Sequence, residues 1–486
     1  MQSRTKIFSQ LVRDYMGPAR VVLDSGATVA DLLGRMTAAK ATSALVVDAQ
    51  GALAGIITEQ DVTRRIALRC DGSEPVTGVM TAPVRAIDAD DYLYDAIARM
   101  RRFGWRHFPV TNAGGAPVGV IDLHSALAVA GEDVVRDIDR ISHEGSLDGL
   151  REIKAAQVDL ADGLFRDDVP VPEIQALITH INTDIHRRLI DGHLARMAQE
   201  GWGGAPVPFA LIIMGSGGRG ENFLYPDQDN GFILDDYPDS EHARIDSFFI
   251  ELAERLTRDL DAVGFPFCNG FVMATNPVWR KTLSQWREQV SIWAKKRSAI
   301  AVQYSDIFFD FRGAHGVTAM ADELRHVVTA AVRDSPAFLA EVYREIADHK
   351  VALGWFGRLA PEKDHLVHRG QINLKHRGTL PLVAYLRLMA MRNGIEATGT
   401  RARLDALYEL GVLDTDAWDY LRGAFRHITG LLLRQQIADF KAGKEVNNFI
   451  WPEDLTERER DQLVDSFKAI DELRDQVKVE FAGDIF

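Results

Sequence analysis

The chain has 486 residues, of which 46% are hydrophobic and 26% charged, the balance of an ordinary globular protein. Its net charge of −14 argues against a general nucleic-acid-binding surface, which would need a basic patch. Its two cysteines, Cys70 and Cys268, exclude a disulfide framework and fit a reducing cytosol. At about 150 residues a domain, this length predicts about three domains.

The first residues, MQSRTKIFSQLVRDYM, lack the apolar segment of a signal peptide. The sequence also has no apolar run of about 18 residues, the length that a membrane-spanning helix needs. We therefore expect a cytoplasmic protein that does not associate with membranes.

Residues from about 14 to 130 repeat themselves at a constant offset of 64 positions, without a gap. In each copy the pattern predicts a helix, a strand, a glycine turn and a second strand. The first copy should form a helix over Val29–Ala39 and strands over 44–48 and 54–58; the second should form strands over 108–112 and 118–122. Because so small a unit buries little core alone, the two copies should pack together. The matching pairs include Asp24 with Asp88, Val46 with Val110, Gly55 with Gly119 and Ile57 with Ile121.

The last strand of the first copy ends in GIITEQD, which places Thr58 and Asp61 at the start of a helix. Both residues are good helix caps, and this structural use is one interpretation. The repeat as a whole resembles a tandem pair of CBS domains, a Bateman module, over residues 1–135. That resemblance implies binding of AMP or ATP, with Thr58 at the phosphate and Asp61 at the ribose. The second copy has Asp122 and Ser125 instead, which departs from the family pattern and puts its nucleotide site in question.

A charged, helix-rich segment over 136–200 is expected to connect this module to the rest of the chain. The motif Val169-Pro-Val-Pro172 predicts a break in the helix. Three histidines, His180, His186 and His193, lack the spacing of metal ligands. Its apolar residues are spaced for one buried helix face: Ile174, Leu177, Ile178, Ile181, Ile185 and Leu189.

The stretch from Leu211 to Asp235 reads LIIMGSGGRGENFLYPDQDNGFILD. Its glycine-rich turn suits phosphate, because glycines let backbone N–H groups approach an anion, Ser216 adds a hydroxyl and Arg219 a bidentate cation. The acids Asp227 and Asp229, two positions apart on an extended chain, face the same way and suit a hard cation such as Mg²⁺ or Mn²⁺. Each part alone also occurs in ordinary loops. Together, in this order, they predict nucleotidyl or phosphoryl transfer.

A two-metal site needs a third carboxylate, and the stretch SDIFFDFR over 305–312 offers one. Taken as a strand, it directs Asp306, Phe308 and Asp310 away from the core. We predict Asp310 as the third ligand, with Asp306 as the alternative.

The order of turn and acid pair resembles the polymerase-β-type nucleotidyltransferase signature, and the words GSGGRGE, DQDN and VMATNPVWR resemble the DUF294 family, which is related to the uridylyltransferase of the PII signal protein. The resemblance implies a nucleotidyltransferase domain over 201–320. Within it, Trp279 and Trp286 lie on one predicted helical stripe, which favours core packing over base stacking. Cys268 has no histidine partner and is not proposed as a nucleophile. The implied phosphate ligands are Gly215, Ser216, Gly217 and Arg219, and the implied metal and catalytic residues are Asp227, Asp229 and Asp310.

Residues 321–486 should be all-helical, with amphipathic runs over Leu380–Met391 and Leu421–Phe440. They resemble the helical substrate-binding domain that accompanies DUF294 transferases. In the motif INLK, Asn373 stands where the family has an acid. This leaves Lys375 as the stronger candidate for a phosphate contact. The alternative is that Lys375 is an ordinary surface lysine.

Together these features predict a multidomain α/β and α protein: a CBS-pair α/β module, a polymerase-β-type nucleotidyltransferase α/β domain and a C-terminal all-α domain. The implied activity is Mg²⁺-dependent transfer of a nucleoside monophosphate from a nucleoside triphosphate to a protein or small-molecule hydroxyl. Adenine nucleotide on the CBS pair would regulate it, and CBS modules often pair into homodimers. The alternative is a non-catalytic, nucleotide-sensing signalling protein with a degenerate transferase domain.

Overall fold

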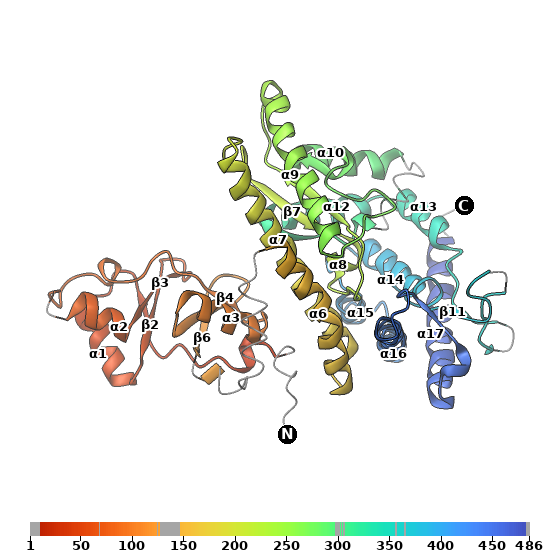
Figure 1. Cartoon of the computed structure of the whole chain (residues 1–486), viewed down its shortest axis with the longest axis horizontal. Coiled ribbons are helices and arrows are strands. Elements are labelled where there is room, and N and C mark those ends of the chain that lie inside the picture. The colour runs from red at the N-terminus through yellow and green to blue at the C-terminus, as the bar shows by residue number, and fades with distance from the viewer. Residues whose placement is uncertain are drawn as a thin grey trace. The chain divides into compact units, whose positions relative to one another are not determined.

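The computed structural model describes residues 10–67, 69–123, 125–126, 146–296, 302, 304, 307–354, 357–363 and 366–482. The chain divides into two compact units, Met1–Glu144 and Gly145–Phe486 (Figure 1). No helix among the described residues has both the length and the apolar character needed to cross a membrane.

The first unit is built from two copies of one motif, as the repeat predicts. Each copy has a three-stranded sheet, in the orders β1-β2-β3 and β4-β5-β6, with the first pair of strands parallel and the second antiparallel. The first copy consists of β1 (Val22–Asp24), α1 (Val29–Ala39), β2 (Ser43–Val47), β3 (Leu53–Thr58), α2 (Glu59–Asp61) and the π-turn η3 (Val62–Ile66). The second consists of β4 (Ile87–Asp88), α3 (Leu93–Phe103), β5 (His107–Thr111) and β6 (Pro117–Asp122). The short 3₁₀ helices η2 (Val12–Asp14) and η4 (Val76–Gly78) precede the first and the second copy, respectively.

The offset of 64 relates the bounds of α1 to α3, β2 to β5 and β3 to β6, so the sequence repeat is a structural repeat. The predicted helix Val29–Ala39 is confirmed at both ends. The copies also contact one another: a Cβ on Gly119 would lie 2.7 Å from the Gly17 carbonyl oxygen, and Thr42 hydrogen-bonds His107 at 2.8 Å. The prediction that the copies pack together is therefore confirmed.

The second unit has a four-stranded sheet in the order β10-β7-β8-β9. Strand β7 (Phe209–Ile213) is antiparallel to both β8 (Asn230–Leu234) and β10 (Arg312–Gly316), and β8 is parallel to β9 (Arg280–Thr282). All residues of β7 and β8 are buried, because helices cover both faces of the sheet. Phe209 packs against Phe249 of α9 (His242–Val263) on one face, whereas Ile212 joins the large core on the other.

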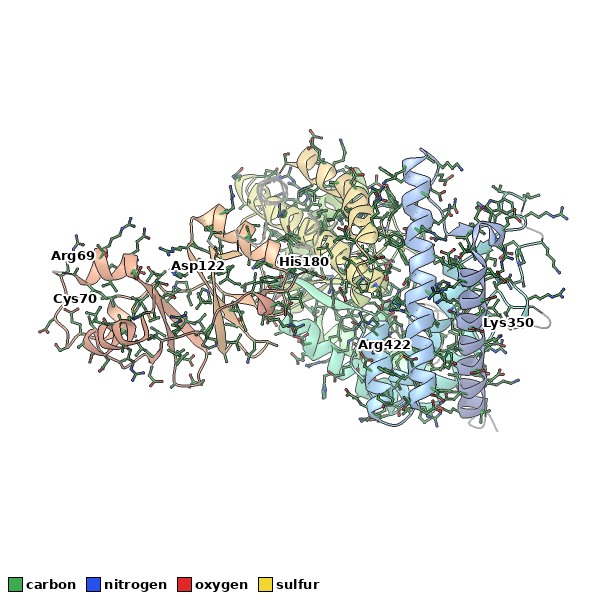
Figure 2. The ribbon with its side chains drawn as sticks, turned by 90° about the horizontal axis from the view of Figure 1, so that it is seen from below. Arg69, Cys70, Asp122, His180, Lys350 and Arg422 are labelled. Carbon is green, nitrogen blue, oxygen red and sulfur yellow. The ribbon has the colours of Figure 1, made fainter. Side chains whose placement is uncertain are left out.

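Helices α6 (Leu147–Arg166) and α7 (Val171–Gln199), from the segment expected to be a connector, pack against α9 within this unit (Figure 1). The expected break between them is confirmed, because α7 begins at Val171. His180, labelled in Figure 2, lies on α7. Burial lowers the pKa of His186 and of His193 to about 4, so both imidazoles are neutral near pH 7.

The rest of the second unit is almost entirely helical, and one core runs through it and one face of the sheet. Helices α14 and α16 confirm that the two predicted runs are helical. The run in α14 is not amphipathic, because every residue from Pro381 to Met391 is buried. A two-stranded sheet of β11 and β12 is the exception to an all-helical end. The remaining elements are α8 (Gly215–Arg219), η5 (Asp239–Glu241), η6 (Pro277–Trp279), α10 (Leu283–Lys296), α12 (Ala319–Arg333), α13 (Pro336–Ile346), β11 (Ile372–Asn373), η8 (Lys375–Thr379), α14 (Leu380–Arg392), α15 (Thr400–Glu409), α16 (Thr415–Lys441), β12 (Phe449–Ile450), η9 (Pro452–Asp454) and α17 (Glu457–Ala482).

Two local predictions are wrong. The stretch before β10 is not a strand: Ile307 and Phe308 are helical, Asp310 lies in a turn, and β10 begins at Arg312. The apparent alternation misleads because consecutive aromatic side chains, Phe308 and Phe309, are both buried. Asp306 lies outside the described residues.

The expected helical stripe of tryptophans is also broken. Trp279 ends the turn η6, strand β9 follows, and Trp286 lies on the separate helix α10. Both indoles are fully buried, with ring centroids 6.2 Å apart, so the interpretation as core residues is confirmed.

Candidate active site

The glycine-rich segment forms a short helix, α8, immediately after strand β7. Gly215 has a φ of +57°, and a Cβ there would lie 2.7 Å from Oδ2 of Asp229. At Gly218, a Cβ would lie 1.6 Å from the carbonyl oxygen of Asp310. Glycine is therefore required at both positions, because α8 fits closely between the segments that carry the two acids.

The acid pair lies directly against this helix. The Met214 amide donates to the Asp229 carbonyl oxygen at 2.9 Å, which joins the start of α8 to the strand that follows the pair. One ligand atom each from Asp227, Asp229 and Cys268 lie within 4.8 Å of one another, the only such group among the described residues.

Electrostatics at Asp229 favour binding of a cation. Burial and then the Asp227 carboxylate raise the pKa of Asp229 to about 7, while the Cys268 thiol and the charges of Lys375 and Arg219 act in the opposite direction. Oδ1 of Asp229 is buried without a hydrogen-bond partner. A carboxylate that is crowded by another and holds an unsatisfied oxygen is stabilised by a hard divalent cation, so the pair fits Mg²⁺.

Cys268 does not share this chemistry. Burial and the neighbouring Asp229 raise the pKa of its thiol to about 12, so the sulfur remains protonated. A protonated thiol is a poor ligand for Mg²⁺, which prefers oxygen.

Lys375 comes to this site from η8, in the helical C-terminal part of the unit. Its side chain is exposed, and its positive charge opposes the rise of the Asp229 pKa. The structure therefore places Lys375 near enough for its charge to act on Asp229, although the two residues lie about 150 positions apart in the sequence.

Asp310 lies elsewhere. Its fully buried carboxylate contacts Arg219 at 2.7 Å, Arg387 at 2.8 Å and Arg403 at 2.6 Å. It is not among the residues that group with Asp227 and Asp229. This geometry does not agree with the predicted metal-ligand role, because three guanidinium groups already neutralise the acid.

Arg219 is engaged in the same cluster rather than directed toward a phosphate. Its guanidinium contacts Glu221 at 2.8 Å as well as Asp310, and these two acids raise its pKa despite burial. Glu221 in turn accepts from the amide and hydroxyl of Thr400 at 2.6 and 3.0 Å, and Thr398 donates to the Gly218 carbonyl at 2.9 Å. Hydrogen bonds from the start of α15 and the residues just before it therefore hold α8 in place.

Ser216 is a partly exposed residue of α8 with a hydroxyl group. Nδ2 of Asn222 donates to Ser216 Oγ at 2.9 Å. Gly217 is buried, and a Cβ there would lie 2.4 Å from Ile213, which again leaves room only for glycine.

The first unit contains a cavity of about 470 Å³, which both copies line. Thr58 and Asp61 lie at its wall as a reciprocal helix cap, in which Asp61 Oδ2 accepts from the Thr58 hydroxyl at 2.8 Å and from its amide at 3.0 Å. Arg106 and His107 line it from the second copy. The capping interpretation of Thr58 and Asp61 is thus confirmed, and the same side chains border a space of ligand size.

The matching positions of the second copy also form a helix cap, but there the acid comes first and the hydroxyl residue second. Asp122, labelled in Figure 2, accepts from the Ser125 amide at 3.1 Å. Its carboxylate also lies 3.5 Å from Arg106 and 3.8 Å from His107. Neither Asp122 nor Ser125 lines the cavity that borders Thr58.

Fold and site together define a protein with a paired-repeat α/β module and a mixed-sheet domain of the nucleotidyltransferase kind. Comparison with known families agrees. Residues 155–299 match the model described as "Putative nucleotidyltransferase DUF294", and residues 336–481 match "Putative nucleotidyltransferase substrate binding domain". Residues 12–68 and 76–132 each match the CBS domain. The chain is a member of the DUF294 family with an N-terminal CBS pair.

Individual relatives match only part of the chain. An uncharacterised 17.7 kDa protein of Acidianus ambivalens is 30% identical over 102 residues, 21% of this chain and 62% of that protein. A CBS domain-containing protein of Arabidopsis thaliana is 26% identical over 130 residues, 26% of this chain and 23% of its own length. The chain thus spans less than two thirds of these relatives. A solved structure of a CBS domain protein from Pyrobaculum aerophilum, complexed with AMP, is 20% identical with a TM-score of 0.24, and covers 26% of this chain and 97% of that one.

Sequence reasoning missed the buried polar residues behind α8: Lys154, Gln157, Asn182 and Asn222. A signal was present, because Lys154 falls within the apolar stripe of α6, between Leu150 and Val158. A lysine at a core-facing position indicates either a polar partner or a functional role.

Proposed function

We propose that the second unit is a Mg²⁺-dependent nucleotidyltransferase that moves a nucleoside monophosphate from a nucleoside triphosphate to a hydroxyl of a protein or small molecule. The observation that carries this proposal is the placement of Asp229 directly against α8, the helix that carries Ser216, with the charge of Lys375 also acting on this acid. Membership of the DUF294 family supports the same class of reaction.

The residues divide the work by their chemistry. Asp227 and Asp229 would hold Mg²⁺, which when bound neutralises phosphate charge. Ser216 and the N–H groups at the start of α8 donate to phosphate oxygens, and Lys375 adds a positive charge. The acceptor oxygen forms a bond to the α-phosphorus, the bond from that phosphorus to the β-phosphate oxygen breaks, pyrophosphate leaves, and the acceptor proton passes to water. Asp310 has no part in this scheme other than holding α8 in place.

For the first unit we propose adenine-nucleotide binding in the cavity beside Thr58 and Asp61, with an effect on transfer. The cavity volume suits a nucleotide, and Arg106 offers a cation to a phosphate. The AMP complex of the Pyrobaculum aerophilum CBS protein favours this class of ligand. Regulation requires that the nucleotide bind two states of the protein with different affinity.

A second function is favoured by one observation. Because Asp310 is sequestered by arginines, the site offers two carboxylates where a complete two-metal site has three. A chain that binds nucleotide without turnover and acts as a sensor would have this composition.

The experiment that tests the proposal is transfer of label from α-³²P-nucleoside triphosphates, each base separately, with Mg²⁺, into the protein itself or a fractionated cell extract. We expect label with the wild type, none with Asp229→Asn, and full transfer with Asp235→Asn, an exposed aspartate at the end of the same strand region. The reaction is run with and without AMP or ATP. Equal inactivity of wild type and Asp229→Asn with every base would instead support the sensor.

A further inference from the structure

Lys154 is a buried lysine that the proposed chemistry does not use. It lies on α6, one residue before the part of the chain that matches the nucleotidyltransferase model, and is 6% exposed. Three oxygens accept from its ammonium group: Gln157 Oε1 at 3.0 Å, Asn182 Oδ1 at 3.2 Å and the Leu224 carbonyl at 2.9 Å. The ring of Phe265 covers it at 4.4 Å. Three acceptors match the three N–H donors of an ammonium group, without any ion pair to a described carboxylate.

A chain of amide hydrogen bonds leads from Lys154 to α8. Asn182 Nδ2 donates to Asn222 Oδ1 at 3.1 Å, and Asn222 Nδ2 donates to Ser216 Oγ at 2.9 Å. Gln157 Nε2 also donates to Asn182 Oδ1, at 2.8 Å. We call Lys154, Asn182, Asn222 and Ser216 the relay; its first three side chains are all at least nine-tenths buried.

The lysine determines the direction of every bond in the relay. An amide side chain can turn over and exchange its donor and acceptor ends. An ammonium group, the form that Lys154 has below its pKa of about 7, can only donate. Asn182 must therefore present its oxygen to Lys154 and its nitrogen to Asn222. Asn222 must then present its nitrogen to Ser216. The Ser216 oxygen becomes an acceptor on its inner side, so its proton is available on the outer side.

Among the described residues, no oxygen accepts a hydrogen bond from the Ser216 hydroxyl. Ser216 is partly exposed on α8 and follows Gly215, which lies against Asp229. An outward O–H donor at that place suits a phosphate oxygen.

We propose that Lys154 is a positioning residue for phosphate: through Asn182 and Asn222 it holds the Ser216 hydroxyl as an outward donor to a phosphate oxygen of the nucleotide. The proposal rests on the proposed function in taking α8 as the phosphate site. It adds a residue from α6, outside the sequence signature, to the phosphate-binding apparatus.

The test measures binding of inorganic tripolyphosphate to the full-length protein by titration calorimetry. Ser216→Ala should weaken binding about 10-fold or more, the effect of losing one hydrogen bond to a charged group. Lys154→Met should weaken it by a similar factor, and the double variant no further than Ser216→Ala alone, because both changes remove one interaction. The control is Lys441→Met, which removes a lysine of α16 that pairs with Asp162.

Asn182→Asp tests the direction of the relay and avoids the risk that Lys154→Met does not fold. The new carboxylate pairs with Lys154 but can only accept, so Asn222 must turn its nitrogen inward and its oxygen toward Ser216. Ser216 then donates inward, and tripolyphosphate affinity should fall as in Ser216→Ala.

The outcomes separate the two proposals. If Ser216→Ala loses affinity while Asn182→Asp and Lys154→Met bind as the wild type does, the relay is overturned and the nucleotidyltransferase proposal stands. If Ser216→Ala itself binds normally, α8 is not the phosphate site and the relay falls with it; the label-transfer assay then decides separately whether the chain is an enzyme.

Discussion

Nη1 of Arg387 lies 2.8 Å from Oδ2 of Asp310, and both side chains are buried. Arg387 belongs to α14, and the other arginines on the same carboxylate belong to α8 and α15. Burial and the charges of Arg403 and Arg219 lower the pKa of Arg387 well below its ordinary value. One acid thus keeps three mutually repelling cations together, and through them it joins the candidate phosphate-binding helix to the C-terminal helices.

Replacement of this acid should destabilise the whole second unit. Asp310→Asn leaves buried guanidinium groups without a counter-charge, which costs about 3–5 kcal/mol. Urea unfolding in the absence of divalent metal should show this loss. The control is Asp148→Asn, whose partner Arg151 is exposed, and which should unfold like the wild type. If Asp310 were instead a metal ligand, metal-free stability would be unchanged or raised.

Mg²⁺ should raise the melting temperature of the wild type but not that of Asp229→Asn. A cation that binds only the folded protein stabilises it by about 2.7 kcal/mol at 100 times its dissociation constant. The pair offers such a cation a buried, unsatisfied oxygen. Melting curves with and without MgCl₂, with Asp235→Asn as the control, measure this. An equal shift in Asp229→Asn would place the cation elsewhere.

Lys154 should give the protein a distinctive pH dependence of stability. Burial lowers the pKa of Lys154 from 10.5 to about 7. Between pH 7 and pH 10.5 the unfolded chain therefore binds more protons at this residue than the native protein, so the free energy of unfolding rises with pH in that window. Below pH 7 the contribution is constant. Lys154→Met lacks this rise. Urea unfolding of both proteins at each end of the window should therefore show that the free energy of unfolding increases with pH more in the wild type than in the variant. Parallel curves would mean that the ammonium group is as well stabilised in the native protein as in water.

AMP binding should depend on the Thr58–Asp61 helix cap, which borders the cavity, and not on an equivalent helix cap elsewhere in the first unit. Asp61→Asn should weaken AMP binding about 10-fold or more, since a charged hydrogen bond is lost. Asp31→Asn provides a matched control, because Thr28 and Asp31 form the same reciprocal cap at the start of α1, with the same 2.8 Å hydroxyl contact, but do not line the cavity. Titration of the full-length protein with AMP measures both. Equal affinities would assign Thr58 and Asp61 a purely structural role.

Much of the architecture could be predicted from the sequence because its signals are local. The 64-residue repeat has one match for each element, and the order of strand, glycines and acids identifies the nucleotidyltransferase segment. The stretch before β10 failed because burial of consecutive aromatics, Phe308 and Phe309, overrides the alternation of a strand.

The site was predictable only in part, for a physical reason. Spacing indicates that Asp227 and Asp229 share a face. It does not reveal which acid will form ion pairs with three arginines from distant parts of the sequence. Arg387 and Arg403 reach Asp310 only through packing of helices far along the chain. The same holds for the relay, whose members lie between positions 154 and 222 and meet only after α6 and α7 pack.

The distribution of these contacts determines which fragments of the protein would keep the candidate site intact. A fragment cut to the 155–299 family match would lack Lys154, Asp310, Lys375 and the whole of α15. Its Arg219 would lose Asp310 and its Glu221 would lose Thr400. Asn222 would still donate to Ser216, but Asn182 would lose the lysine that fixes its direction. The smallest portion that keeps every one of these contacts runs from α6 through α15. The segment 155–299 that matches the family model is therefore smaller than the segment that holds the candidate site together.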